Sequence, residues 1–265
     1  MNKLKTYGLL VLFISSFLSI NANNGEDWGS TGHRTTGKIA EQYLSKRAKR
    51  NIAKLLDGKS LAFVSTFGDE IKSDKGELYR SFYSWHYVNF PFNSNYEDSK
   101  KNPKGDIIVG IETCIQKIKS DTETKETKAI YLKMLIHLMG DLHQPLHVGR
   151  GEDKGGNSIQ VQWFKKGTNL HRVWDTNMID NFNMGYAELA ANADKLTKKQ
   201  VKFIQEGTIL DWVYETQKLA IKVYDTAKSG DKLWYQYPYE NFGTVRSQLQ
   251  KGGIRLAKVL NDIFG

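Results

Sequence analysis

Residues 125–147 read KETKAIYLKMLIHLMGDLHQPLH, and this stretch carries the strongest indication of the fold. Apolar side chains recur at helical spacing until Pro145, whose ring cannot continue the helical hydrogen bonds. On such a helix His137 and Asp141 are four residues apart and share one face, so both can reach one metal ion. His147 points elsewhere unless the helix ends at Pro145, in which case it suits a neighbouring ion better.

The same helical periodicity predicts most of the remaining structure. Residues 31–57 carry apolar side chains three and four apart and are expected to end near Gly58. Residues 106–120 repeat the pattern and place Cys114 on the apolar face, where it is expected to be a small buried hydrophobe. Later helices are predicted at 185–195, 207–228 and 240–263, the last beginning after Pro238.

Evidence for strands is confined to one segment. Residues 157–171 (NSIQVQWFKKGTNLH) alternate apolar and polar side chains, which predicts one short β-hairpin with its turn at Lys166–Gly167. Residues 88–105 and 148–157 are rich in Asn, Gly, Lys and Asp and are expected to be loops. The predicted class is mainly α.

The composition limits what kind of protein this chain can be. With 265 residues, 40% hydrophobic and 25% charged, it is neither a coiled-coil rod, a disordered tail nor a polytopic membrane protein. No repeat or linker interrupts the sequence after Trp28, so residues 28–265 are interpreted as one domain. The single cysteine excludes an internal disulfide. A net charge of +9 favours anionic partners without choosing among them.

The first 22 residues have the pattern of a secretory signal peptide. Lys3 and Lys5 precede an uncharged apolar run over 7–20, and Ala22 offers a small residue for cleavage. The rival interpretation, an uncleaved anchor, needs about 20 apolar residues, and this run is shorter. The chain is therefore expected to be exported to a periplasm or beyond, without membrane attachment after cleavage. No obligate protein partner is inferred.

Further histidines and carboxylates lie in aromatic or apolar surroundings. His33, Asp69 and His86 precede the 125–147 stretch, and His171 and Asp175 repeat the His-x3-Asp spacing. One such pair alone is weak evidence, because His and Asp four residues apart on a helix often form only a surface hydrogen bond. Together the eight side chains suit zinc, which takes about four N or O ligands, and could serve two or three ions.

The order of these motifs resembles the zinc-dependent S1/P1 nuclease family of single-strand-specific endonucleases and 3′-nucleotidases. The resemblance runs from Trp28 to the C-terminal helix and implies a single-domain, multi-helix fold like that of phospholipase C and P1 nuclease. It rests on six motifs in this order: Trp28-Gly-x2-Gly-His33, Asp69-x2-Lys72, Trp85-His86-Tyr87, His137-x3-Asp141-x-His143-Gln-Pro-Leu-His147, Gly155-Gly156-Asn157 and Asn169-Leu-His171-x2-Trp-Asp175.

The resemblance implies a site for three zinc ions. The ligands that it implies for the first ion are Asp69, His86 and His137, with Asp141 bridging the first ion to the second. The second ion would also take His33 and the main-chain amino nitrogen and carbonyl of Trp28. The third would take His147, His171 and Asp175. His143 is left without an ion and is expected to pack or to orient a ligand.

The resemblance also implies the reaction. Phosphodiester bonds of single-stranded DNA and RNA would be cut to 5′-phosphorylated products by a hydroxide that bridges two zincs, while the third zinc stabilises the leaving 3′-oxygen. The same centre would release phosphate from 3′-nucleotides. Lys72 matches a position where the family places a basic side chain against the phosphate; its other interpretation is a solvated charge on a helix.

Base binding is expected from residues around the ligands. Tyr87 matches an aromatic residue that stacks on a base in the family, which gives single-strand preference because only an unpaired base is free to stack. The alternative is that Tyr87 fills the core. Asn89 stands where family members often carry Asp, so base preference is open. Asn157 and Asn177 are further candidates for substrate binding.

A second departure from the family pattern concerns the N-terminus. The family's mature chain normally begins at the tryptophan, whereas residues 23–27 here separate Ala22 from Trp28. If they persist, Trp28 has an amide nitrogen in place of a free amine. Cleavage as late as residue 27, a weaker site, or ligation through the carbonyl alone all remain open.

Two other functions compete with the nuclease. A zinc phospholipase C shares fold and ligands with the family, but has Glu where this chain has Asp175. The Gly-Gly-Asn motif and the hairpin between His147 and His171 also favour a nuclease. The second alternative is a non-catalytic, basic nucleic-acid-binding protein in which zinc only supports the fold.

Overall fold

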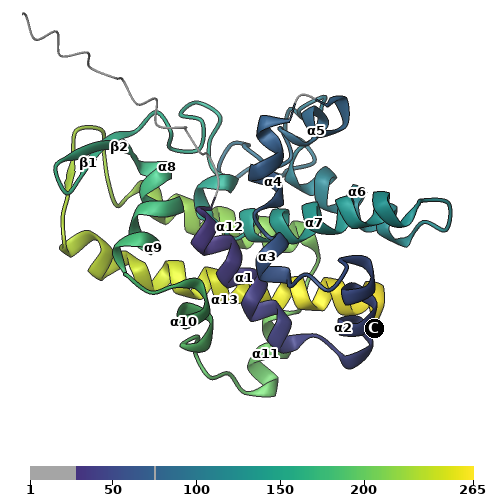
Figure 1. Ribbon diagram of the computed structural model, residues 1–265. Helices are drawn as coiled ribbons and strands as arrows, with labels where there is room; N and C mark the ends of the chain where they lie inside the picture. The colour runs from purple at the N-terminus through teal and green to yellow at the C-terminus, as the bar shows by residue number, and fades with distance from the viewer. Residues whose placement is uncertain (1–27, 75) are drawn as a thin grey trace, which may run out of the picture.

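The computed structural model describes residues 28–74 and 76–265, and the predicted signal peptide lies outside the described residues. The longest described helix, α13 (Gln236–Phe264), runs across the molecule from the side of the sheet, and α1 (Ser30–Tyr43) packs against it (Figure 1). Beside them α6 (Ile107–Lys119) pairs with α7 (Lys125–Asp141). The mainly α class is confirmed, as are the predicted helices at 106–120 and in the 125–147 stretch.

The other elements are shorter. Two further helices of substantial length are α2 (Lys46–Leu55) and α12 (Ile209–Tyr224). Short helical segments connect them: α3 (Leu61–Val64), α4 (Phe67–Glu70), η1 (Ile71–Ser73), α5 (Glu77–Phe82), η2 (Pro145–Val148), α8 (Leu170–Arg172), η3 (Val173–Asn177), α9 (Met178–Asn181), α10 (Tyr186–Ala191) and α11 (Lys198–Ile204).

Two predicted helix boundaries are wrong. The periodic stretch 31–57 forms two helices, because Ser45 caps a new helix: its hydroxyl oxygen accepts a hydrogen bond from the Ala48 N–H at 3.0 Å. The last helix begins at Gln236, before Pro238 and not after it. Proline is tolerated there because N–H groups in the first turn of a helix need no partner within it.

The predicted hairpin is present, with a different turn. Strand β1 (Gln160–Trp163) pairs antiparallel with β2 (Lys166–Asn169), Val161 lying opposite Thr168. The turn is Phe164–Lys165, both at positive φ (46° and 69°), and not Lys166–Gly167. A third strand, β3 (Lys232–Leu233), which the sequence does not predict, pairs parallel with β1 to complete a small sheet.

The buried apolar side chains form two clusters, and the candidate ligands come from segments that belong to both. One cluster spans α1, α2, α6, α7 and α12 and includes fully buried Cys114, as expected. The other surrounds the sheet, α9 and the first half of α13, and includes Trp28 and Trp174. Asp141 ends a helix of the first cluster, whereas Asp175 follows Trp174 in the second.

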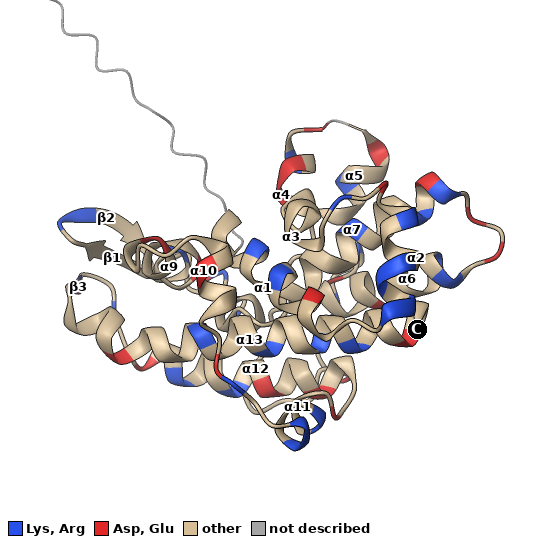
Figure 2. Ribbon diagram, turned by 60° about the horizontal axis from the view of Figure 1, so that its bottom comes forward, with Lys and Arg blue, Asp and Glu red and all other residues tan. Residues whose placement is uncertain are grey.

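The outer surface carries most of the charge. Lys and Arg residues are concentrated on α2, on α11 and at the turn of the hairpin (Figure 2). Among the helices of the described residues, none is both long and apolar enough to cross a membrane.

Candidate metal centre

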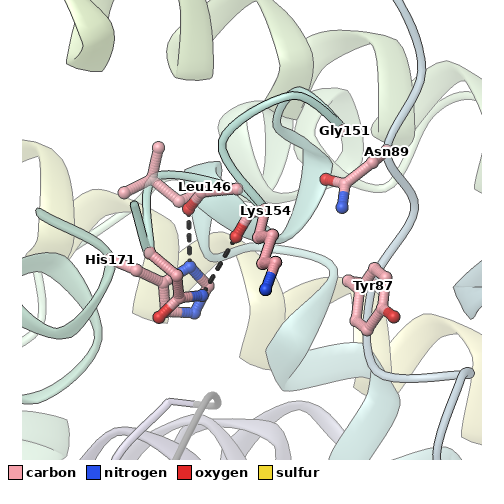
Figure 3. Close-up of a pocket in the computed structure, with 8 residues that line it drawn as sticks. Tyr87, Asn89, Leu146, Gly151, Lys154 and His171 are labelled. Carbon is pink, nitrogen blue, oxygen red and sulfur yellow. Dashed lines mark hydrogen bonds between the residues drawn. The ribbon is translucent and has the colours of Figure 1, made fainter. Parts of the chain in front are cut away.

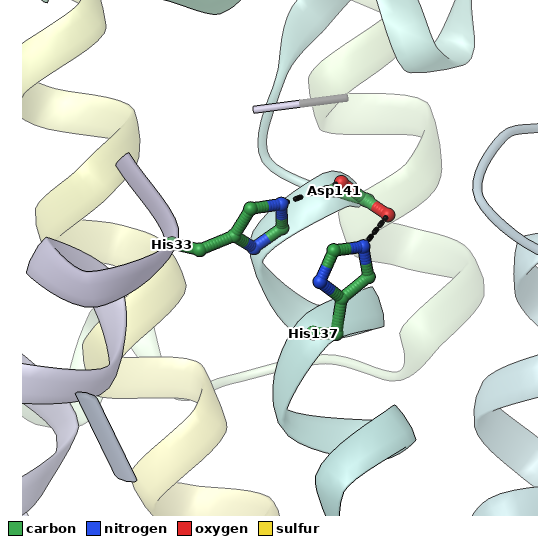
Figure 4. A group of neighbouring side chains, drawn as sticks. All are labelled: His33, His137 and Asp141. Atoms are coloured by element: carbon green, nitrogen blue, oxygen red, sulfur yellow. Dashed lines mark ion pairs between the residues drawn. The ribbon is translucent and has the colours of Figure 1, made fainter. Parts of the chain in front are cut away.

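Asp141 is the centre of a buried group of imidazoles. Its Oδ2 lies 3.2 Å from His137 Nε2, whereas Oδ1 lies 3.3 Å from His33 Nε2 (Figure 4). Oδ2 also lies 3.0 Å from His86 Nδ1. All four side chains are almost completely buried. The two oxygens of one carboxylate thus face different imidazoles, an arrangement that can hold two cations side by side.

Close packing fixes the imidazoles on one side of Asp141. The rings of His33 and His137 are stacked with centroids 3.9 Å apart. Gly68 also lies against the His137 ring, and an added Cβ there would come within 2.3 Å of His137 Cδ2. The next residue, Asp69, places Oδ1 3.9 Å from His137 Nε2 and remains about one-third exposed. Asp69, His86 and His137 therefore form a second grouping of ligand atoms, open to solvent on the Asp69 side.

A third grouping joins His147, His171 and Asp175. His147 Nε2 lies 3.6 Å from Asp175 Oδ1, and the His147 and His171 rings are stacked 5.0 Å apart. After α7 the chain turns through η2, which begins at Pro145. His147 lies in η2, and its Nδ1 is 3.6 Å from Asp141 Oδ1. The helix ends four residues before Pro145, at Asp141, so His147 does not continue its face; that His147 serves a neighbouring ion stays a prediction.

The main chain orients three of the imidazoles. The Nδ1–H groups of His137, His147 and His171 donate to the carbonyl oxygens of Ser65, His86 and Gly155, at 2.8, 2.8 and 2.7 Å. Such bonds fix the tautomer with its lone pair on Nε2, the form in which a histidine binds a metal. Each Nε2 then faces its grouping of carboxylates.

His143 differs from these histidines in having both ring nitrogens engaged by the protein. Its Nδ1–H donates to the Met139 carbonyl at 2.8 Å, and its Nε2 accepts from Arg255 Nη1 at 3.2 Å. Burial, together with the charge of Arg255, lowers the pKa of His143 to about 3. The ring is therefore neutral and has no nitrogen left for an ion, which fits the packing role expected from the sequence.

The electrostatics of the buried group favour binding of a cation. Burial alone would raise the pKa of Asp141, but the charges of His137, His147 and His33 lower it well below its usual range. Burial and the neighbouring His137 lower the pKa of His33. Asp141 Oδ1 and His147 Nε2 are buried and have no hydrogen-bond partner among the described residues. Buried polar atoms are usually satisfied, so the donor set fits divalent cations of the zinc type.

The remaining predicted residues on this side lie at the edge of the centre. Lys72 Nζ is 3.2 Å from Asp69 Oδ1, so its charge lies at the open rim of the Asp69–His86–His137 grouping. Trp28 is 1% exposed, and the next residue, Gly29, donates its N–H to the Asp175 carbonyl at 3.0 Å. The chain thus enters α1 beside the centre. Whether Trp28 carries a free amine depends on residues 1–27, which lie outside the described residues.

A pocket of about 290 Å³ opens next to the His147–His171–Asp175 grouping. Tyr87, Asn89, Asn157 and His171 line it, and Lys154 points into it from the opposite wall (Figure 3). Tyr87 is 37% exposed, so the alternative that it fills the core is wrong. Sequence reasoning missed Lys154; the available signal was a basic residue directly before the Gly-Gly-Asn motif.

The loop that forms this wall of the pocket is held in place by contacts of a buried carboxylate. Buried Asp153 accepts hydrogen bonds from the Tyr224 hydroxyl at 2.7 Å and from the Gly156 N–H at 2.8 Å, and pairs with Arg150. Gly155 has a φ of 63°, and a Cβ there would lie 2.5 Å from the Leu146 carbonyl oxygen. Only glycine fits this close approach, which brings the Gly155 carbonyl onto His171.

Asn177, the remaining predicted substrate residue, does not lie with Tyr87, Asn89 and Asn157. It lines a separate groove of about 520 Å³ along the β-hairpin, together with Trp163 and Arg172. The structure therefore divides the predicted substrate residues between two cavities, one on each side of α8.

A helical fold with buried groups of His and Asp around a shared carboxylate defines a class of protein built to hold several divalent cations beside a pocket. A model of the S1/P1 nuclease family matches residues 28–265, and the chain belongs to this family. It is 33% identical to Endonuclease 4 of Arabidopsis thaliana, over 89% of this chain and 89% of that protein. It is 33% identical to Endonuclease 3 of the same plant, over 96% of both chains. With Nuclease P1 of Penicillium citrinum it shares 27% identity, over 90% of this chain and 98% of that protein. The resemblance inferred from the motifs is confirmed: the chain is a metal-dependent nuclease that acts on nucleic acid.

Proposed function

We propose that this protein is an exported zinc endonuclease that hydrolyses single-stranded DNA and RNA to 5′-phosphorylated products and releases phosphate from 3′-nucleotides. The observation that carries the proposal is the position of Asp141, whose two oxygens face separate imidazoles at 3.0 to 3.3 Å. Membership of the S1/P1 nuclease family supports the reaction type.

The donor set divides among three ions in this proposal. Asp69, His86 and His137 would hold the first ion, Asp141 would bridge it to a second, and His33 with the main chain of Trp28 would complete the second. His147, His171 and Asp175 would hold the third. Bound zinc ions supply Lewis acidity toward phosphate oxygens and make water a usable nucleophile near neutral pH.

The side chains around the centre would position the substrate. Lys72, at the open rim beside Asp69, would hold the phosphate by its charge. The exposed ring of Tyr87 would stack on a base, and the amides of Asn89 and Asn157 would hydrogen-bond the edge of that base. A base within a duplex is already stacked and paired, so this pocket supports a preference for single strands.

The critical experiment removes the charge of Asp141 while keeping its shape. Asp141→Asn should lower kcat/KM on denatured DNA at least a hundredfold, because even residues that only orient a metal ligand contribute about 10- to 100-fold. Asp57→Asn is the matched control, since Asp57 pairs with Lys125 on the exposed surface, away from the candidate ligands. Unchanged cleavage by Asp141→Asn would refute the bridging role, and turnover of phosphatidylcholine without turnover of DNA would instead indicate a phospholipase.

Metal content and export have a separate test. We expect three zinc ions per chain by native mass spectrometry of the exported protein, and an N-terminus at Trp28 by N-terminal sequencing. A chain that starts at residue 23 and still binds three ions would contradict ligation by a free amine at Trp28.

A further inference from the structure

Gln144 lies in the middle of the longest motif and has no part in the proposed function. The residue is completely buried, and its main chain is bonded to candidate ligands on both sides. Its N–H donates to the Asp141 carbonyl at 3.0 Å, and its carbonyl accepts from the His147 N–H at 3.0 Å. Burying a side-chain amide costs free energy unless its polar atoms are hydrogen-bonded, so the partners of this amide indicate its role.

The orientation of the Gln144 amide follows from its partners. The atom that faces the Leu146 N–H at 2.6 Å must be the amide oxygen, because an N–H can donate only to an acceptor. The amide nitrogen then points the other way and lies 3.4 Å from Asp175 Oδ1. Gln144 therefore joins the turn that carries His147 to the segment that carries Asp175.

The carboxylate of Asp175 is held from outside its own segment. It lies in η3, one turn with π-helical hydrogen bonds, a rare arrangement that occurs often at functional sites. The neighbouring Thr176 hydroxyl lies 3.5 Å from Oδ2, at the limit of a hydrogen bond. The contact from Gln144 crosses from η2 and fixes Asp175 relative to His147, whose Nε2 is 3.6 Å from the same oxygen.

An uncharged donor suits a carboxylate that binds a cation. Carboxylates that bind metal ions are usually hydrogen-bonded as well, and these partners fix their direction. The Gln144 amide donates without carrying a charge, so Asp175 keeps its full negative charge for the cation. Lysine or arginine at this place would form an ion pair with Asp175 and compete with the metal.

We propose that Gln144 is a positioning residue for the third grouping. Its amide sets the position of the Asp175 carboxylate relative to His147, and thereby the affinity of the grouping for its cation. The side-chain bonds of Gln144 are to Leu146 and Asp175, so the other two groupings keep their affinity without it. This inference rests on the proposed nuclease function and gives a role to a residue that touches neither cation nor substrate.

A cap is the alternative role for Gln144, since its oxygen already satisfies an N–H group in the first turn of η2. A cap stabilises the turn and leaves the metal affinity unchanged. Gln144→Asn separates the two roles by length. Asparagine readily accepts from the N–H two residues later, but it is one methylene shorter, so its nitrogen cannot reach Asp175.

The test titrates the metal-free protein with Zn²⁺, counts bound ions by native mass spectrometry, and measures Tm in chelator. It compares Gln144→Asn with Gln144→Met, which removes both hydrogen bonds. Gln250→Met is the matched control: Gln250 is 6% exposed, and its amide nitrogen donates to the Asp194 carbonyl at 2.7 Å. Asp175→Asn, with and without Gln144→Asn, shows whether Gln144 acts through Asp175.

Gln144→Asn should weaken the binding of one of three ions by about 10- to 100-fold and leave the Tm in chelator close to that of the wild type. Gln144→Met should weaken the same ion and also lower the Tm. Gln250→Met should leave all three ions in place. In the Asp175→Asn protein, Gln144→Asn should cause no further loss.

Activity gives an independent reading. In the proposed function the third ion stabilises the leaving 3′-oxygen, so kcat on denatured DNA should fall in Gln144→Asn while KM stays unchanged. Hydrolysis of bis(p-nitrophenyl) phosphate, whose leaving group needs less help, should fall less.

Wild-type affinity for all three ions in Gln144→Asn would overturn the proposal and leave Gln144 a cap. Equal loss of all three ions, additive losses in the double variant, or a wild-type protein without a third ion would overturn it as well. A wild-type protein that binds three ions but cleaves neither substrate would refute the nuclease function, and the Zn²⁺ titration alone would then decide the role of Gln144.

Discussion

Gly68→Ala should break the metal centre without touching any ligand. Gly68 lies in α4 directly against the imidazole of His137, and an added Cβ would lie 2.3 Å from Cδ2 and 2.7 Å from Nε2. Alanine itself suits a helical backbone, so the substitution acts only through this contact.

The size of the effect follows from the space around His137. Ordinary contacts between carbon atoms are about 3.5–4.0 Å, so the ring must retreat by on the order of 1 Å. It cannot do so freely, because His33 stacks on it at 3.9 Å and Ser65 holds its Nδ1 at 2.8 Å. Zinc–nitrogen bonds are about 2.0–2.1 Å and tolerate errors of about 0.2 Å. We therefore expect loss of the ion between Asp69, His86 and His137 and a fall in kcat/KM of about a hundredfold.

Two measurements check this prediction: metal ions per chain by native mass spectrometry, and kcat/KM on denatured DNA. Gly243→Ala in α13 is the control, since a Cβ at that position meets nothing within 4 Å among the described residues. A Gly68→Ala protein with the full number of ions and wild-type activity would refute the geometry described for His137.

Two further predictions concern stability. Burial would raise the pKa of Glu215, but hydrogen bonds and ion pairs with Lys251 and Arg255 lower it to about 2. A carboxyl with a lowered pKa stabilises the fold above its unfolded pKa of about 4.5 and loses this effect as the pH falls toward 2. The Tm difference between wild type and Glu215→Gln, measured in chelator, should therefore shrink between pH 5 and pH 2; a constant difference would contradict the ion pairs. Asp106 caps α6 by accepting main-chain N–H groups at 3.0 and 3.3 Å, so Asp106→Ala should cost about 1–2 kcal/mol in urea unfolding. Asp121→Ala in an exposed loop is the control, and equal losses from both variants would exclude a specific cap.

The parts of the fold that sequence predicts are those set by local patterns. The helix at 106–120 is recovered within one residue at each end, because Asp106 marks its start and apolar spacing continues to Ile118. The hairpin strands follow from their alternation. Their turn was misplaced because the usual rule seeks glycine at positive φ, whereas Phe164 and Lys165 occupy these positions.

Features that depend on tertiary contacts could not be predicted from the sequence pattern. Strand β3 has two residues and exists only through pairing with β1, about 70 positions earlier, so no local pattern marks it. The four-residue spacing alone predicts that His137 and Asp141 lie close together, since both are on one helix. The approach of His33 and His86 to the same carboxylate is not encoded by any spacing, and only the resemblance to a family suggested it.

The residues that line the pockets also divide into those that a local pattern predicts and those that it does not. Tyr87 and Asn89 are neighbours of a ligand and could be inferred from that position, whereas Lys154 reaches their pocket from a braced loop more than 60 residues later. Asn177 is close to the candidate ligands in sequence, but the structure places it in the hairpin groove and not in the Tyr87 pocket.

The spread of the candidate ligands from His33 to Asp175 bears on how the protein is made. Closing chain loops of this length costs entropy, and no fragment shorter than that span contains the whole donor set. The three groupings can therefore form only in a folded chain, and ions bound there would stabilise the folded molecule over partly folded ones.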